Sequence, residues 1–374
     1  MPPVPKNRVG NGGRAGIFRN EHSVAVAKQT ITRTSRDASG IDLVSRPRSP
    51  LGDAWRSLLH HRIAVASGCF VILLGLIAIS ADYLNPFVLQ GYSDVLDRLN
   101  QPAFAKQTLQ DNAVPPMTPS ANPDLEGFVY WVGADSLGRD LVSRTMYGAR
   151  VSLAVAVTAA LVSLIIGLAY GLTSGYFGGR IDELMMRFVD FLYGLPIIIV
   201  VILMQVYFKA MARRGADEGF VGTILSINAA MGGMLFVFIA IGALNWIGMA
   251  RIARGQTLSY KQKEFVEAAR ATGSRPPRIL FSHLLPNILG PCIVQETLQI
   301  PGYILLEATL SFIGLGVDPP TPSWGIMINE GFLALRSAPH IILVPATALV
   351  LTVLSFNFLG DGLRDAFDPR QRGV

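Results

Sequence analysis

Charged residues and cysteine are scarce in this sequence, and each shortage excludes a class of protein. Charged side chains make up 16% of the 374 residues, against 51% that are hydrophobic, whereas soluble globular domains carry about 25% charged residues. So apolar a chain does not stay disordered over most of its length. The two cysteines, Cys69 and Cys292, are too few for a disulfide framework or a zinc ribbon. We expect an integral membrane protein, and the long uncharged runs argue against nucleic acid as a partner.

The motifs of nucleotide binding and of hydrolytic catalysis are also absent. The sequence has no G-x-x-x-x-G-K-[ST] phosphate loop and no H-E-x-x-H pair. Residues 171–175 have the wrong spacing for a nucleophile elbow. None of the five histidines has metal-ligand spacing to another beside a carboxylate. We expect no catalytic residue, no metal site and no cofactor in this chain, so that any ATP–Mg must be held by another subunit.

Six apolar stretches are long enough to cross a membrane, since a spanning helix needs about 20 mostly apolar residues. One of them is less clean than the others because it holds Glu296 and Glu307. The predicted fold class is all-α: a polytopic membrane protein with six transmembrane helices. These helices are placed at about residues 58–84, 151–173, 188–208, 230–250, 288–312 and 341–360.

The basic residues set the predicted orientation. Residues 1–57 form a basic tail that we expect to be disordered and cytoplasmic under the positive-inside rule; it could contact anionic membrane lipid or be inert. Six spans return residues 363–374 to the cytoplasm, on the same side as the basic loop 251–286. Residues 85–148 then form a long external segment. Residues 209–233 form a second external loop that could include a short surface helix.

The loop after the fourth span is predicted to fold into a compact knob. Residues 258–272 contain good helix formers with one apolar face, and Gly273 is placed to end that helix. Pro276 and Pro277 suit the first turn of a second helix, and Pro286 marks a bend where the chain re-enters the membrane. Such a knob fits docking to a cytoplasmic partner. A solvated basic connector is the alternative.

Three carboxylates lie in or beside predicted spans, namely Asp190, Glu296 and Glu307. A charge in hydrocarbon costs at least a few kcal/mol, so each of them must face water, a partner helix or an interface. Glu296 lies within about one helical turn of Gln295 and Gln299, and this polar patch is the candidate translocation path. Packing of Glu296 against a partner subunit is the alternative.

The other two carboxylates have readings of their own. Asp190 is placed to pair with Arg187 or to line the path, and Glu307 to contact a partner or close an external gate. A stripe of small residues on the second span favours close helix packing over a hinge; it consists of Gly167, Gly171 and Gly175.

The knob resembles the EAA motif of ABC-importer permeases: E-A-A, three residues, Gly, nine residues, usually Ile, one residue, Leu-Pro. The matching residues are Glu267, Ala268, Ala269, Gly273, His283, Leu285 and Pro286. His283 stands at the usual Ile position, a departure typical of the peptide-importing branch. It could hydrogen-bond the knob to a core helix or respond to pH. The resemblance implies a coupling helix that seats in a groove on an ATPase subunit.

Further segments resemble the C-type permease subunit of oligopeptide and dipeptide importers. Residues 133–140 are similar to its external G-T-D-x-x-G-R-D signature, with Ala134 in place of Thr. The other matching segments are residues 186–190, 195–196, 307–316, 322–325 and 357–369.

This resemblance implies a type I ABC importer permease fold, with residues 149–362 as its core. Such a subunit is not an enzyme and forms half of a transmembrane path for peptides in the bacterial plasma (inner) membrane. Its implied partners are a second homologous permease subunit, two cytoplasmic ATPase subunits and an external solute-binding protein. Two alternatives stay open: a secondary transporter driven by an ion gradient, and an ABC importer of a metal chelate or a sugar.

Overall fold

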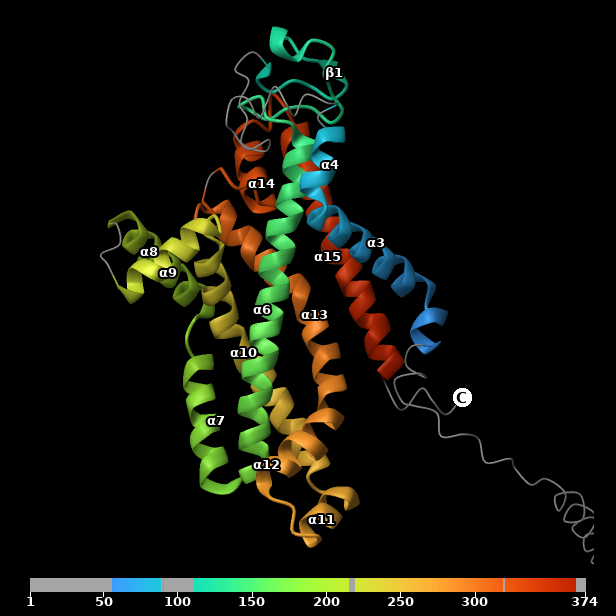
Figure 1. Cartoon of the computed structure of the whole chain (residues 1–374), viewed down its shortest axis with the longest axis vertical. Coiled ribbons are helices and arrows are strands. Elements are labelled where there is room, and N and C mark those ends of the chain that lie inside the picture. The colour runs from blue at the N-terminus through green and yellow to red at the C-terminus, as the bar shows by residue number, and fades with distance from the viewer. Residues whose placement is uncertain (1–55, 89, 91–110, 215–218, 319, 368–374) are drawn as a thin grey trace, which may run out of the picture. The chain divides into compact units, whose positions relative to one another are not determined.

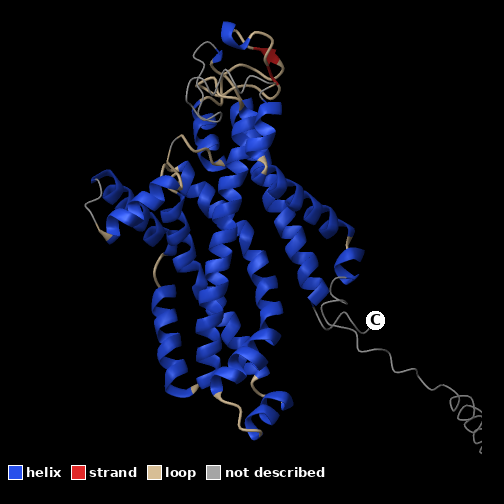
Figure 2. Cartoon of the chain, in the orientation of Figure 1, coloured by secondary structure: helices blue, strands red, loops and turns tan. Residues whose placement is uncertain are grey.

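The computed structural model describes residues 56–88, 90, 111–214, 219–318 and 320–367. Most of the predicted tail, residues 1–57, and the end of the predicted C-terminal segment, residues 363–374, lie outside these residues. The described part belongs to one compact unit, Leu51–Val374. It is helical almost throughout, as Figure 2 shows, which confirms the predicted all-α class.

The elements follow one another along the chain as labelled in Figure 1. The only strands among the described residues are β1 (Thr118–Pro119) and β2 (Val129–Tyr130), which pair antiparallel with Thr118 opposite Tyr130. A single 3₁₀ turn, Pro123–Leu125, separates them. The helices are α3 (Arg62–Ile79), α4 (Ala81–Val88), α6 (Leu141–Phe177), α7 (Gly179–Tyr193), α8 (Ile197–Arg214), α9 (Phe220–Ala230), α10 (Met234–Tyr260), α11 (Glu264–Ala271), α12 (Pro276–Arg278), α13 (Leu285–Phe312), α14 (Trp324–Leu333) and α15 (His340–Phe367), with a π-helical turn, Ile279–Leu284, between α12 and α13.

Four of the described helices are long and apolar enough to cross a membrane, namely α3, α6, α10 and α15. The number becomes five if α7 and α8 count as one span, which is bent by 78°. Helix α13 has 28 residues but carries Glu296 and Glu307 and is not among them. The predicted number of six is therefore not confirmed.

Two predicted helix boundaries are wrong for identifiable physical reasons. The third predicted span, residues 188–208, is broken, because the chain turns at Gly194 and Pro196 begins a new helical direction. The second predicted span begins at Leu141, ten residues earlier than expected. Asp140 caps it there: its Oδ2 accepts a hydrogen bond from Ser143 N at 2.7 Å.

The predicted external loop 209–233 is largely helical where it is described. Helix α8 continues to Arg214 and α9 covers Phe220–Ala230. Pro291 and Pro301 both lie inside the single helix α13.

The core of the bundle forms where α6, α10 and α13 pack against one another. Val155 and Ala159 of α6, Ile241 of α10 and Ile304 of α13 are fully buried in one apolar cluster. Beyond this cluster, α6 and α10 approach closely at the stripe of small residues. A Cβ added to Gly167 would lie 2.5 Å from Met249 Cγ, so the predicted packing role of the stripe is confirmed.

The same closeness continues along the stripe. A Cβ added to Gly171 would lie 2.7 Å from the Cβ of Ala253, and one added to Gly175 would lie 2.8 Å from the Cβ of Thr257. Real Cβ atoms do not approach other heavy atoms this closely. Glycine at these positions therefore sets the distance between the two helix backbones.

Gly171→Val is expected to destabilise the folded chain by about 1–3 kcal/mol, because the added methyl groups force α6 and α10 apart. The measurement is thermal unfolding of the purified protein in mild detergent, with size-exclusion chromatography to detect aggregation. Gly248→Val is the matched control, since a Cβ added to Gly248 of α10 meets nothing within 4 Å. Equal melting temperatures for the two variants would contradict the packing role.

Candidate functional site

The candidate coupling segment, residues 261–286, lies at the end of the bundle opposite the β1–β2 pair (Figure 1). Its helix α11 is amphipathic. Val266 and Ala269 are buried in an apolar cluster with side chains of α6, α10 and α13, whereas Glu267 and Ala268 are exposed. The third residue of the Glu-Ala-Ala sequence thus holds α11 on the bundle, and the first two are presented to solvent.

The predicted single helix over residues 258–272 is wrong. Helix α10 ends at Tyr260, and α11 begins at Glu264 after an extended residue, Lys263, with φ −83° and ψ 146°. This break turns α11 away from the axis of α10, so that only its Val266 side returns to the apolar cluster.

Gly273 ends α11 as predicted, and the turn it forms is specific to glycine. Its φ is +78°, a left-handed conformation that residues with a Cβ adopt at a cost. Gly273 N donates to Arg270 O at 2.9 Å and Ser274 N donates to Ala269 O at 3.0 Å. These two bonds satisfy the last carbonyl groups of α11 in a Schellman motif.

The return to the bundle is a continuous helical run rather than a bend. Pro276 and Pro277 occupy the first turn of α12, as predicted. The π-helical turn then leads directly into α13, and Pro286 lies in the first turn of that helix, where a proline does no harm. The bend expected at Pro286 is therefore wrong.

His283 lies in the π-helical turn and is half-buried. Its carbonyl oxygen accepts from Asn287 Nδ2 at 2.6 Å. The described residues include no hydrogen-bond partner for its ring, so the expected bond from His283 to a core helix is absent there.

Two aromatic side chains are exposed at the same end, Phe265 at 40% on α11 and Phe281 at 65% in the π-helical turn. Exposed aromatic groups beside charged ones are typical of protein interfaces. Sequence patterning gave no reason to single them out, since Phe265 fits the apolar side of a longer helix. Their exposure depends on the break at Lys263 and on the π-helical turn.

Cation–π and carbonyl contacts join the coupling segment to the end of α6. The guanidinium carbon of Arg270 lies 5.6 Å from the centre of the Tyr176 ring. Lys261 Nζ donates to Tyr176 O at 2.5 Å. About two turns earlier, on α10, Arg254 binds Asp182 of α7 with two 2.6 Å hydrogen bonds. The coupling segment therefore packs against a part of the bundle where contacts between side chains hold α6, α7 and α10 together.

The expected pair of Asp190 with Arg187 is not formed. Arg187 Nη2 lies 2.6 Å from Glu183 Oε1, one turn away on α7. Asp190 Oδ1 lies 2.6 Å from Arg251 Nη2 of α10, and the same guanidinium lies 4.2 Å from the centre of the Tyr193 ring. Asp190 is exposed in this chain, so it remains available to a path or to a partner.

The predicted polar patch of Gln295, Glu296 and Gln299 is divided between two sides of α13. Gln299 is exposed and Gln295 half-buried. Glu296 is 3% exposed and faces α6, where its carboxylate accepts from Tyr303 Oη at 2.7 Å and from Ser163 Oγ at 3.3 Å. Glu296 is thus bonded within its own chain and does not share a surface with Gln299.

Glu307 is fully buried near the other end of α13. Its two oxygens accept from Ser152 Oγ at 2.8 Å and from Ser311 Oγ at 2.6 Å. The contacts expected with a partner subunit or an external gate are therefore not open to this side chain in the conformation described here.

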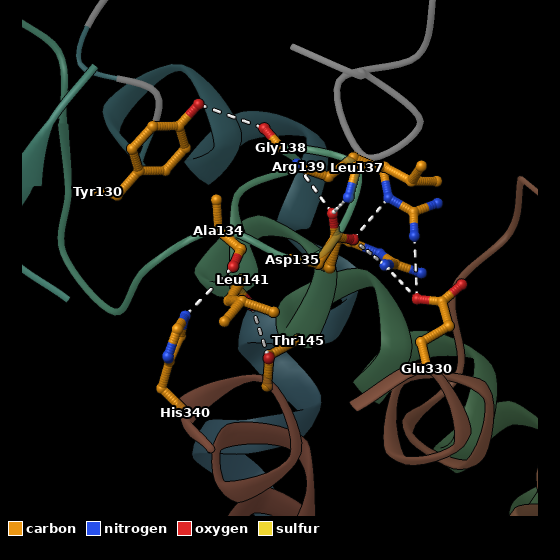
Figure 3. A network of polar contacts seen from close by, with 11 residues as sticks. Tyr130, Ala134, Asp135, Leu137, Gly138, Arg139, Leu141, Thr145, Glu330 and His340 are labelled. Atoms are coloured by element: carbon orange, nitrogen blue, oxygen red, sulfur yellow. Dashed lines mark hydrogen bonds and ion pairs between the residues drawn. The ribbon is translucent and has the colours of Figure 1, made fainter. Parts of the chain in front are cut away.

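At the β1–β2 end, four charged side chains form a network around Asp135, drawn in Figure 3, in which Asp135, Arg139 and Arg144 are buried and Glu330 is partly exposed. Asp135 accepts from Leu137 N at 2.8 Å and from Arg139 Nε at 2.6 Å, and it contacts Arg144. Arg139 and Arg144 both reach Glu330 Oε2 of α14, at 2.9 and 2.6 Å. Two guanidinium groups are thus balanced by two carboxylates.

This network explains the spacing of the glycines and charged residues within the segment 133–140. Gly133 and Gly138 both have positive φ, +97° and +74°, and they allow the tight turn that places Asp135 above the start of α6. His340 Nε2 lies 3.3 Å from Ala134 O on one side of the turn (Figure 3). Glu330 comes from 191 residues beyond Arg139, so no local pattern could have identified it.

Comparison with known proteins adds the observation that decides the family. A family model described as the inner membrane component of binding-protein-dependent transport systems matches residues 163–373, which include the whole coupling segment. The chain belongs to this family. It is therefore a multi-pass membrane subunit of a transport system, as the resemblance implied. A second model, the N-terminal transmembrane domain of oligopeptide transport permease C, matches residues 49–103.

Individual relatives cover nearly the whole chain. A dipeptide transport system permease of Bacillus subtilis is 39% identical over 333 residues, which is 88% of this chain and 89% of the relative. An oligopeptide transport system permease of Escherichia coli K12 is 40% identical over 325 residues, 87% of this chain and 93% of the relative. A glutathione transport system permease of Pectobacterium atrosepticum is 38% identical over 324 residues, 86% and 92%.

Asp140, the N-cap of α6, supplies a testable pH dependence beside the network around Asp135. Burial raises its pKa from 3.8 to about 7, so the folded protein retains a proton that the unfolded chain releases near pH 4. Stability must then fall as pH rises from about 4 to about 7, by at most about 1.4 kcal/mol per pH unit. Asp140→Asn keeps a helix cap and removes the ionisation.

We expect the melting temperatures of wild type and Asp140→Asn to agree near pH 4, and the variant to become progressively more stable than wild type up to about pH 7. The measurement is thermal unfolding in detergent between pH 4 and pH 8. Parallel profiles for the two proteins would show that Asp140 does not hold the extra proton.

Proposed function

We propose that this chain is the permease subunit of an ATP-driven peptide importer, and that it forms half of the transmembrane path together with a second homologous permease. The observation that supports this most is the coupling segment. At one end of the bundle it presents Glu267, Ala268 and the exposed Phe265 on α11, which ends at the Gly273 turn, and the exposed Phe281 in the π-helical turn. An ATPase subunit with a complementary groove is the partner that such a surface fits. Two such subunits bind ATP–Mg, and this chain holds no cofactor.

The substrate path across the membrane runs along surfaces of this chain that none of its own side chains covers. Gln299 and Asp190 are exposed and Gln295 is half-buried, so these side chains can face a substrate when the second permease completes the path. Their polar groups suit weak contacts with peptide amides and charged termini. Nucleotide-driven closure of the ATPases would move the coupling segment and rock the helices between two states.

The substrate class comes from the relatives. Three of them are named for dipeptide, oligopeptide and glutathione transport, and all three ligands contain peptide bonds. An external solute-binding protein delivers the peptide in this proposal. In the proposed membrane orientation, the coupling segment and both termini lie in the cytoplasm and the network around Asp135 lies outside.

Purification of the tagged chain from its native membranes in mild detergent tests the assembly. We expect two ATPase subunits and a second permease to co-purify in near-stoichiometric amounts. A chain that comes alone across several detergents would contradict the proposal. Uptake that survives ATP depletion but collapses with the proton gradient would instead favour an ion-driven transporter.

Glu267→Lys and Gly273→Pro are expected to leave membrane insertion intact and to abolish peptide uptake. The first reverses an exposed charge on the docking face. The second cannot adopt the left-handed turn, and it removes the backbone N–H that donates a hydrogen bond to Arg270 O. Gly273→Ala, which keeps that N–H and strains the turn by about 1 kcal/mol, is expected to be milder.

Glu183→Lys is the control for the charge reversal, because Glu183 is exposed at the same end and bonds only to Arg187 among the described residues. Uptake and membrane content are measured side by side in cells. Normal uptake by both coupling variants would refute the role of the segment.

A further inference from the structure

Helices α6 and α13 are joined at two points by a serine and a buried carboxylate. Near the external end, Ser152 Oγ of α6 donates to Glu307 Oε2 of α13 at 2.8 Å. Further along the pair, Ser163 Oγ of α6 donates to Glu296 Oε2 of α13 at 3.3 Å. All four side chains are buried. We refer to these two serine–carboxylate contacts as the outer rung and the inner rung.

The second oxygen of each carboxylate is also satisfied by a hydroxyl group. Tyr303 Oη donates to Glu296 Oε1 at 2.7 Å, and Ser311 Oγ donates to Glu307 Oε1 at 2.6 Å. Among the described residues, neither carboxylate forms an ion pair with Lys, Arg or His. Every oxygen of the two carboxylates thus already accepts a hydrogen bond from its own chain, and both side chains are buried away from a substrate path.

The spacing of the rungs fixes the register of the two helices. The rungs lie about 11 residues apart on each helix, which is about three turns and returns to the same face of a straight helix. Because α6 and α13 run antiparallel, both rungs can form only in one alignment. Sliding by a single turn would separate both buried carboxylates from their serine donors on α6 and leave each with only the donor of its own helix, Tyr303 or Ser311, which is unfavourable in an apolar surrounding.

The outer rung also supports the external end of the structure. A Cβ added to Gly316 would lie 2.6 Å from Ser311 Cβ, and one added to Gly325 would lie 2.7 Å from the same atom. The chain after α13 and the start of α14 therefore fold directly over the Glu307–Ser311 pair. The inner rung lies on the same helix that continues without interruption from the coupling segment.

We propose that Glu296 and Glu307 are positioning residues that lock α6 and α13 into one rigid unit. A displacement of the coupling segment then reaches the external end as a movement of the whole unit rather than as sliding of α13 along α6. That the movement starts at the coupling segment and passes to the external end rests on the proposed importer function. The locking itself rests only on the two rungs.

A distance measurement tests the locking without substrate or nucleotide. Nitroxide labels are placed at Ile165→Cys on α6 and Leu305→Cys on α13, both exposed positions, with Cys69→Ser to remove the exposed native thiol. Pulsed electron paramagnetic resonance on the purified protein, with whatever subunits co-purify, gives the distribution of distances. We expect one narrow distribution for the wild-type rungs.

Variants of the rungs separate the hydrogen bonds from the charge. Glu296→Gln and Glu307→Gln can still bond both hydroxyl groups and are expected to keep the narrow distribution. The double variant Ser152→Ala/Ser163→Ala removes only the donors across the helix pair and is expected to broaden it, as is Glu296→Leu where that protein folds. Thr309→Val is the matched control, because its hydroxyl donates to Leu305 O of its own helix.

Uptake of radiolabelled trialanine and ATP hydrolysis by the assembled complex supply the functional readout. The double serine variant is expected to lose about tenfold or more of its uptake while ATP hydrolysis continues, and the two glutamine variants are expected to retain uptake. The proposal is overturned if the double serine variant keeps the wild-type distribution. It is also overturned if the glutamine variants lose uptake with unchanged distances, since that would make the carboxylates part of the path. A complex without ATPase subunits would refute the importer function and leave the distance result standing.

Discussion

The close approach of α6 to α10 is the constraint on which the rest of the described structure depends. Three glycines on one side of α6 bring the two backbones together, and a Cβ at any of them would collide with α10. An adjacent face of α6 is then left for α13, where serine hydroxyls meet the two buried carboxylates. The ion pair of Asp182 with Arg254 ties α7 to the same two helices. Packing by small residues and hydroxyl groups replaces the apolar driving force that lipid does not provide between helices.

The charged side chains at the ends of the helices have different partners from those in the middle. Ion pairs with full charge lie at the two ends of the helices: Arg139 and Arg144 with Asp135 and Glu330 at one, Arg254 with Asp182 at the other. Between them, the carboxylates of α13 meet only hydroxyl donors among the described residues. The polar groups in the middle therefore serve contact between helices, and those at the ends fix loops and the coupling segment.

Local geometry could be predicted from the sequence, and contacts between distant segments could not. The turn at Gly273 could be predicted because a glycine directly after an amphipathic helix commonly ends that helix in a left-handed conformation. The glycine stripe identified its own role through its spacing. Asp190 was misassigned because Arg187 is near in sequence, whereas Arg251 is nearer in space. The polar patch on α13 failed for a simpler reason: Gln295 and Gln299 are one turn apart and share a side, but Glu296 lies about 100° around the helix from Gln295. Glu330 had no signal at all, since its partners lie far away along the chain.

The π-helical turn of Ile279–Leu284 sets the rotation of α13 about its own axis relative to α11 and α12. Such a turn is a local insertion of one residue into an α-helix, and one residue corresponds to about 100° of rotation. Because Ile279, Leu284 and Ile288 all belong to the same buried cluster, the extra residue is what allows both sides of the turn to face the bundle. A regular α-helix through these positions would aim Glu296 away from Ser163. The direction in which the buried Glu296 carboxylate points is thus decided by the winding of the six residues that join α12 to α13.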